Sequence, residues 1–160
     1  MAYMIQDKAI AGSAATTGER AGVVINEVGI IDLAALTTHA NSDTVACMFL
    51  PARHRFIDAK LLADADLDTG STPAKVDVVV MDEDTGAVEY TVVNSAGCAA
   101  ASVTDTLTGD AAVLSRSYFE DDRPVGISIE EHTGLATSGK LYVSLSYAPI
   151  GGWETLIPAD

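Results

Sequence analysis

The strongest constraint on the fold is a series of short segments in which apolar and polar residues alternate, separated by Gly, Pro, Asp and Ser. Alternation with a period of two places one face of a β-strand in the core and the other in water. The last segment shows this clearly, with Leu141, Val143, Leu145 and Tyr147 on one face. The segments cover residues 22–33, 44–50, 57–61, 76–80, 88–92, 125–130 and 141–147. Such a series predicts an all-β fold, an antiparallel β-sandwich or jelly roll.

Within this series, the segment 57–61 alternates as expected for a strand with one buried and one solvent-exposed face. Ile57, Ala59 and Leu61 fall on the side that we expect to face the core. Asp58 and Lys60 fall on the other side, which we expect to face water.

The segment 76–80 is apolar on both faces, because Val79 and Met81 lie on the side opposite Val76, Val78 and Val80. We expect it to pair with 57–61 as a hairpin through the acidic turn 64–70. A strand without a polar face belongs in the centre of a sheet or against a neighbouring chain. Val79 and Met81 are therefore candidates for a subunit contact.

Three less regular regions complete the predicted organisation. Gly29 interrupts the first strand and predicts a bend or bulge. Residues 95–118 are rich in alanine and admit a helical turn, which Asp110 is placed to cap. Few large apolar groups occur in residues 1–21, so we expect this segment to be a flexible N-terminal arm. We expect the sandwich domain to cover residues 22–148 and a C-terminal tail to cover residues 149–160.

The net charge of the chain limits the classes of partner that it can bind. Nine Lys and Arg against 23 Asp and Glu give a formal net charge of -14. This charge repels phosphate, so we expect neither nucleic acid nor anionic membrane as a partner. Basic protein surfaces and divalent cations remain possible partners. Alternatively, the acidic residues serve only to keep the protein soluble. Cys47 and Cys98 cannot form a disulfide framework, and they predict buried thiols in a reducing compartment.

Asp64, Asp66 and Asp68 are the best candidates for a metal site. In an extended chain their carboxylates project from one face about 7 Å apart, a spacing at which Ca²⁺ or Mg²⁺ can bind. An EF-hand is excluded because Thr69 and Lys75 stand where its Gly and bidentate Glu belong. A solvated acidic turn is the alternative, and we expect no other cofactor.

The sequence contains no arrangement that predicts an enzyme. The three histidines, His39, His54 and His132, are scattered without the spacing of a zinc site or a catalytic pair. Neither a Gly-rich phosphate loop nor a nucleophile elbow around a serine occurs. We therefore expect a non-enzymatic protein.

Two further sets of residues are candidates for contacts with other subunits. Arg53 and Arg55 flank His54 and form the densest basic spot, which suits salt bridges to an acidic neighbour or a simple strand entry. Trp153, Leu156 and Ile157 are large apolar groups on the tail. They either fold back onto the core or anchor the chain on a neighbouring subunit.

The order of these motifs resembles small virion structural proteins of tailed bacteriophages. The residues that carry the resemblance are Leu50 and Pro51 with the segments 56–61, 64–70, 76–78, 122–127 and 137–147. The resemblance implies a β-sandwich or jelly roll that decorates or cements the capsid by binding the major capsid protein. It also implies synthesis in the host cytoplasm, a place on the capsid exterior, a homo-oligomer with a trimer favoured, and residues 1–21 and 149–160 as arms on neighbouring subunits.

Two alternatives to the capsid decoration hypothesis remain. One is a structural protein of the tail, the neck or the base of a head fibre. The other is a carbohydrate-binding β-sandwich that uses calcium on Asp64, Asp66 and Asp68.

Overall fold

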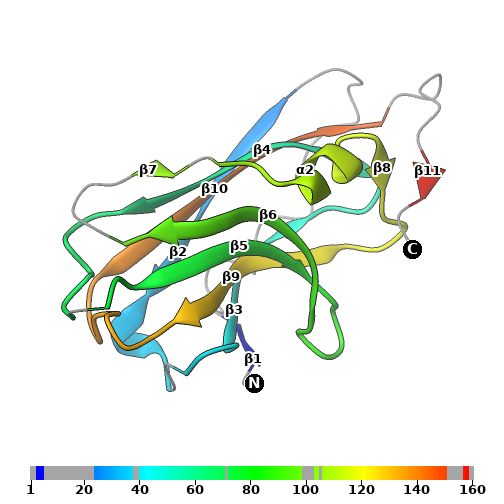
Figure 1. The fold of residues 1–160 in the computed structure, drawn as a ribbon. Coiled ribbons are helices and arrows are strands. Elements are labelled where there is room, and N and C mark those ends of the chain that lie inside the picture. Colours follow the sequence, from blue (N-terminus) through cyan, green and yellow to red (C-terminus); the bar gives the residue numbers. More distant parts are fainter. Residues whose placement is uncertain are drawn as a thin grey trace.

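Two β-sheets lie face to face and enclose the apolar sides of their strands (Figure 1). The structure is a computed structural model. It describes residues 3–5, 24–37, 40–70, 72–98, 103–104, 106–150 and 157–158. The predicted all-β sandwich is confirmed.

The order of strands in each sheet follows from the backbone pairing. The larger sheet has the order β1 (Tyr3–Ile5), β3 (Thr44–Leu50), β9 (Arg123–Glu131), β5 (Lys75–Met81) and β6 (Val88–Gly97). The smaller sheet has the order β2 (Ile25–Asp32), β10 (Lys140–Pro149), β4 (His54–Ala63) and β7 (Val103–Thr104). A separate pair joins β11 (Ile157–Pro158) to β8 (Ser117–Tyr118), and two short helices, η1 (Leu33–Ala35) and α2 (Gly109–Leu114), complete the described elements. Pairing is antiparallel except between β1 and β3 and between β11 and β8.

The core forms where the alternating strands turn their apolar sides inward. In β10, Leu141, Val143, Leu145 and Tyr147 are at most 1% exposed, as the alternation predicts. Each such side chain contributes about 1.5–3 kcal/mol when it is removed from water. The sandwich therefore gains most of its stability between the two sheets.

The hairpin expected between the segments 57–61 and 76–80 is wrong. β4 pairs with β10 and β7 in the smaller sheet, whereas β5 lies between β9 and β6 in the larger one. The connection between β4 and β5 crosses from one sheet to the other, and Leu67 on it is 2% exposed. Because β5 is apolar on both faces, a central place in the larger sheet suits it better than an edge beside β4.

Ile57 also differs from its expected orientation. Ser146 is opposite Asp58 and Tyr147 is opposite Phe56, so Ile57 is the extra residue of a β-bulge. The bulge shifts the alternation, and Phe56 takes the core position with 1% exposure. Beyond the bulge the expected pattern holds, with Ala59 and Leu61 each 1% exposed.

Gly29 is needed for close packing and not for a bulge. The register between β2 and β10 runs through Gly29 without a shift. A Cβ at this position would stand 2.5 Å from the Cys47 sulfur and 3.0 Å from its carbonyl oxygen. Only glycine lets β2 approach β3 this closely across the sandwich.

The helical turn predicted between residues 95 and 118 is present as α2, but Asp110 does not cap it. Thr108 is the N-cap residue, and it makes no side-chain capping hydrogen bond. The Asp110 carboxylate instead accepts a hydrogen bond from the backbone N–H of Thr91, at 3.0 Å. Asp110 therefore ties α2 to β6, while Ala111 and Leu114 face the core. Residues 99–102 lie outside the described part of the chain.

Candidate functional site

The two outward faces of the sandwich are the candidate sites, and the first is that of the larger sheet. Here Val79 and Met81 are 0% exposed and pack with Ala46 in a small apolar cluster that is separate from the main core. The central place of β5 agrees with its two apolar faces. That Val79 and Met81 contact another subunit stays a prediction.

A cavity of about 510 Å³ opens on the same face, beside Val79. Its described lining is mostly polar and combines β5, β6, β9 and the loop before β3: Ser42, Lys75, Asp77, Val79, Val88, Thr91, Ser128, Ile129, Glu130 and Glu131. Three carboxylates face one ammonium group in this lining. The cavity is therefore electronegative and suits a positively charged side chain of a partner.

The outer face of the smaller sheet has a different chemistry. Val28 and Ile30 point outward from β2 and are 60% and 45% exposed, and Val24 just before the strand is 49% exposed. On β10 they are flanked by the half-buried Tyr142 and Ser144, which lie opposite Ile30 and Val28. Sequence reasoning missed this apolar stripe, although the signal was present: both faces of the segment 22–33 carry β-branched residues.

The charged residues of this second face nearly cancel. By strand alternation, its outward charges comprise three basic and two acidic side chains: Arg55, Lys60, Lys140, Asp32 and Asp58. Asp64, exposed just beyond β4, brings the sum over the described residues of this face to zero. The Lys60 and Asp58 side chains lie 3.8 Å apart. In a chain of net charge -14, this face is close to neutral.

The structure does not gather Asp64, Asp66 and Asp68 on one face, because the chain bends there. Asp64 accepts a bond from the Lys140 N–H at 3.3 Å, and Asp66 accepts one from the Asp68 N–H at 3.1 Å. Asp68 instead forms an isolated bridge with Leu135. Within the described ranges, no group of three or more His, Cys, Asp or Glu side chains is placed to hold a metal ion. Binding of Ca²⁺ or Mg²⁺ stays a prediction.

The basic spot at residues 53–55 lies at one end of the sandwich and contacts its own chain. The Arg53 Nε lies 3.7 Å from the Glu120 carboxylate, and its guanidinium lies 6.0 Å from the Tyr118 ring centre. The Arg53 N–H donates to the Phe119 carbonyl at 2.8 Å. Arg55 is half-buried on β4. A salt bridge from either arginine to a neighbouring subunit stays a prediction.

Both predicted arms contribute a short strand to the fold. β1 extends the larger sheet beside β3, and β11, which contains Ile157, pairs with β8 (Figure 1). Trp153 and Leu156 lie outside the described residues. Contacts of the arms with other subunits stay a prediction.

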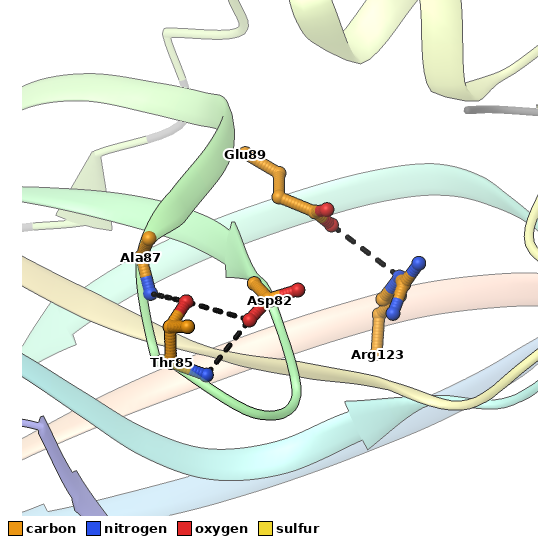
Figure 2. Close-up of polar contacts among 5 residues, drawn as sticks. All are labelled: Asp82, Thr85, Ala87, Glu89 and Arg123. Carbon is orange, nitrogen blue, oxygen red and sulfur yellow. Dashed lines mark hydrogen bonds and ion pairs between the residues drawn. The ribbon is translucent and has the colours of Figure 1, made fainter.

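The polar groups at the β5–β6 turn hold this turn in place (Figure 2). The Asp82 carboxylate accepts bonds from the Thr85 N–H at 2.7 Å and the Thr85 hydroxyl at 2.6 Å. These bonds lower the pKa of Asp82 below its ordinary value. Nearby, the Arg123 Nε lies 3.3 Å from the Glu89 carboxylate, and its guanidinium lies 5.1 Å from the Phe119 ring centre. The Asp82 bonds therefore hold the turn itself, and the Arg123–Glu89 ion pair links β9 to β6.

The two cysteines are buried, and the described histidines are hydrogen-bonded. Burial raises the pKa of the Cys47 thiol to about 12 and that of Cys98 to about 11, so both stay protonated at neutral pH. The His54 ring bonds to the Ala52 carbonyl at 2.8 Å, and the His132 ring bonds to the Asn41 amide oxygen at 2.7 Å. His39 lies outside the described residues. None of the described helices is long and apolar enough to cross a membrane.

Comparison with known proteins gives structural neighbours only. No family model and no curated protein matches the sequence. A chain of the capsid of Ralstonia phage GP4 is similar in structure, with a TM-score of 0.72 and 22% identity over 94% of this chain and 100% of that chain. A chain of the cyanophage Pam1 capsid asymmetric unit is similar with a TM-score of 0.52 and 21% identity, over 85% of this chain and 91% of that one.

Proposed function

We propose that this chain is a non-enzymatic structural protein of a phage virion that decorates or cements the capsid by binding the major capsid protein. The observation that carries the proposal is the end-to-end match with a chain of the Ralstonia phage GP4 capsid, at a TM-score of 0.72. Because 94% of this chain and 100% of that chain are covered, the likeness extends beyond a shared subdomain. The second neighbour also comes from a phage capsid.

The cavity on the larger sheet and the exposed apolar residues of the smaller sheet support a role in binding other proteins. A decorating protein must attach to the shell from outside and keep its own fold, and a sandwich with a closed core meets this need. In this proposal the chain sits on the capsid exterior as a homo-oligomer, with a trimer expected. Its electronegative cavity, lined by Asp77, Glu130 and Glu131, receives basic side chains of the major capsid protein.

Co-sedimentation with capsids tests the proposal. Capsids of the virus that encodes this chain, stripped of the native copies, are mixed with purified protein and pelleted. We expect binding that saturates and weakens as salt is added, since charge attraction contributes to it. Protein that stays in the supernatant at all concentrations would contradict the proposal. Antibody labelling of the tail or neck in place of the head would favour the alternative virion location.

A matched pair of variants tests the part played by the cavity. Glu130→Lys with Glu131→Lys reverses two charges at the cavity, and we expect it to weaken capsid binding at least about tenfold. Glu83→Lys with Asp84→Lys makes the same charge change on the exposed β5–β6 turn and should bind like the wild type. Equal losses in both variants would mean that net charge, and not the cavity, governs binding.

A further inference from the structure

We propose that the open edge of β2 is the contact between two copies of this chain, which pair edge to edge through their smaller sheets. The contact goes beyond the proposed attachment to a capsid, since it forms between purified chains without a shell. Its residues are Asn26, Val28 and Ile30 on β2, with Val24 just before the strand.

The backbone of β2 supplies the first argument. Among the described residues, β2 pairs with β10 on one side and with no strand on the other. The N–H of Leu33 donates to the Gly139 carbonyl at 2.9 Å. Because bonding alternates along an antiparallel pair, the odd-numbered residues of β2 bond to β10 and the even-numbered ones point away from it. Asn26, Val28 and Ile30 therefore direct their N–H and C=O groups to the open edge, which can pair with another strand.

The side chains of these same residues supply the second argument. Six large hydrophobic side chains are exposed in the described part of the chain: Val24, Val28, Ile30, Val88, Leu107 and Val113. Half of them lie on or next to β2, and Val28 is the most exposed of all at 60%. Monomeric proteins usually protect an open edge with charged residues or proline, whereas β2 presents valine and isoleucine. An unprotected edge of this kind is typical of a strand that pairs with a strand of another chain.

Charge identifies the partner as a second copy. Each chain carries a net charge of -14, so two copies repel each other over most of their surface. The cavity face would bring three carboxylates of one copy against three of the other. Pairing at the β2 edge instead places the outer faces of the two smaller sheets side by side, and because the described charges of this face nearly cancel, they do not oppose the contact.

The sequence of β2 is also suited to antiparallel pairing with a second copy of β2. Antiparallel pairing of two β2 strands about a two-fold axis at Gly29 places Val28 opposite Ile30 of the other copy, twice. It places Glu27 opposite Ile31, so like charges do not meet. Moving the axis to residue 27 would put the two Glu27 side chains face to face, which is unfavourable. The axis at Gly29 joins the two four-stranded sheets into one continuous sheet.

Sedimentation velocity over a range of protein concentrations tests the contact. We expect the wild type to form an even-numbered species, a dimer or a pair of trimers. Val28→Lys should weaken this association at least about tenfold, because it places a charge at the centre of the pairing. Val113→Lys, at a site on α2 that is 52% exposed, is the matched control and should associate like the wild type. Wild type that forms only monomers or trimers, or Val28→Lys that associates normally, would overturn the proposal.

Disulfide cross-linking tests the register. A mixture of Val28→Cys and Ile30→Cys chains should form a covalent dimer on oxidation, whereas each variant alone should not. In the proposed register, two copies of Cys at position 28 would be roughly 8 Å apart, too far for a disulfide. The native Cys47 and Cys98 are buried and do not compete. Cross-linking that is equal in all three samples, or absent from the mixture, would overturn the register.

Capsid binding by Val28→Lys separates this proposal from the proposed function. We expect Val28→Lys to bind capsids through its unchanged cavity face while its association in solution is lost. If Val28→Lys associates normally but loses capsid binding, the surface contacts the capsid, and the contact between copies is wrong. If neither the variant nor the wild type binds capsids, the proposed function fails while the contact between copies can still stand.

Discussion

Replacing Gly126 by alanine should strongly destabilise the sandwich, because the chain leaves no room for a Cβ there. Gly126 lies on β9, opposite Ala46 of β3 and next to the bulge between Ala46 and Met48. A Cβ on Gly126 would stand 1.9 Å from the Val45 carbonyl oxygen and 2.8 Å from the Ala46 Cα. Both contacts are with backbone atoms of the paired strand, which cannot rotate away as a flexible side chain can.

The size of the effect follows from that distance. Real Cβ atoms are essentially never closer than 3.0 Å to another heavy atom, so β3 and β9 must separate by about 1 Å locally. Overpacking of a tight core typically costs 1–3 kcal/mol, and displacement of a paired backbone belongs at the upper end. We therefore expect Gly126→Ala to lower the free energy of unfolding by about 3 kcal/mol, which for a chain of this length lowers the Tm by roughly 6–12 °C.

Gly97 on β6 provides the matched control, since a Cβ there would meet no atom within 4 Å. Gly97→Ala should be neutral or slightly stabilising, because it mainly restricts the unfolded chain. Chemical denaturation of the wild type and both variants, with similar slopes against denaturant, gives the comparison. If the free energy of unfolding of Gly126→Ala is within about 0.5 kcal/mol of the wild-type value, the close approach of β3 and β9 is wrong.

Three further predictions concern single side chains. Asp82→Ala should lower the Tm at neutral pH. Because the pKa of Asp82 in the folded protein lies below the ordinary 3.8, the difference in Tm between variant and wild type should hold above pH 3.8 and shrink as the pH falls below it. Calorimetry across the acid range checks this. Cys47 and Cys98 should react with a thiol reagent at pH 8 only after denaturation, and rapid labelling of the native protein would contradict their burial. Asp110→Ala should cost about 1–3 kcal/mol by leaving the Thr91 N–H without its acceptor, and Asp110→Asn, which keeps an acceptor oxygen, should recover part of it in the same unfolding assay.

Local alternation predicted the strands well and their partners poorly. The side chains of residues 141–147 report burial directly, because each one either faces the core or does not. The pairing of β4 and β5 depends on a different question, namely which strands elsewhere in the chain compete for the same edges. β6 follows β5 through a short turn, but β9, the other neighbour of β5, lies far along the sequence, and no local pattern encodes that pairing.

Bulges and close approaches were hidden for a related reason. The bulge at Ile57 arises from the fit of β4 to β10, and it exchanges the roles of Phe56 and Ile57. Gly29 and Gly126 are required by atoms of β3, which the sequence places far from both. Glycine within a strand signals some constraint, but only the packed structure shows which one.

The candidate surfaces were predictable in part. Two apolar faces on the segment 76–80 correctly singled out β5 as central, with Val79 and Met81 on its outer side. The metal hypothesis assumed an extended chain through Asp64, Asp66 and Asp68, whereas the chain bends there and each carboxylate has different surroundings. The stripe of Val24, Val28 and Ile30 was missed because both sides of β2 mix apolar and polar residues, so the sequence alone did not show which side faces water.

The unequal charge of the two faces gives the sandwich a polarity that its fold alone lacks. A protein that both binds copies of itself and attaches to another protein needs two surfaces that do not compete. With a net charge of -14, self-association is least opposed at the β2 edge of the smaller sheet, where the described charges of the outer face nearly cancel. The electronegative cavity lies on the larger sheet, where a second acidic chain is repelled and a basic partner is attracted. Changes at Val28 and at Glu130 with Glu131 should therefore act independently, since they lie on different sheets.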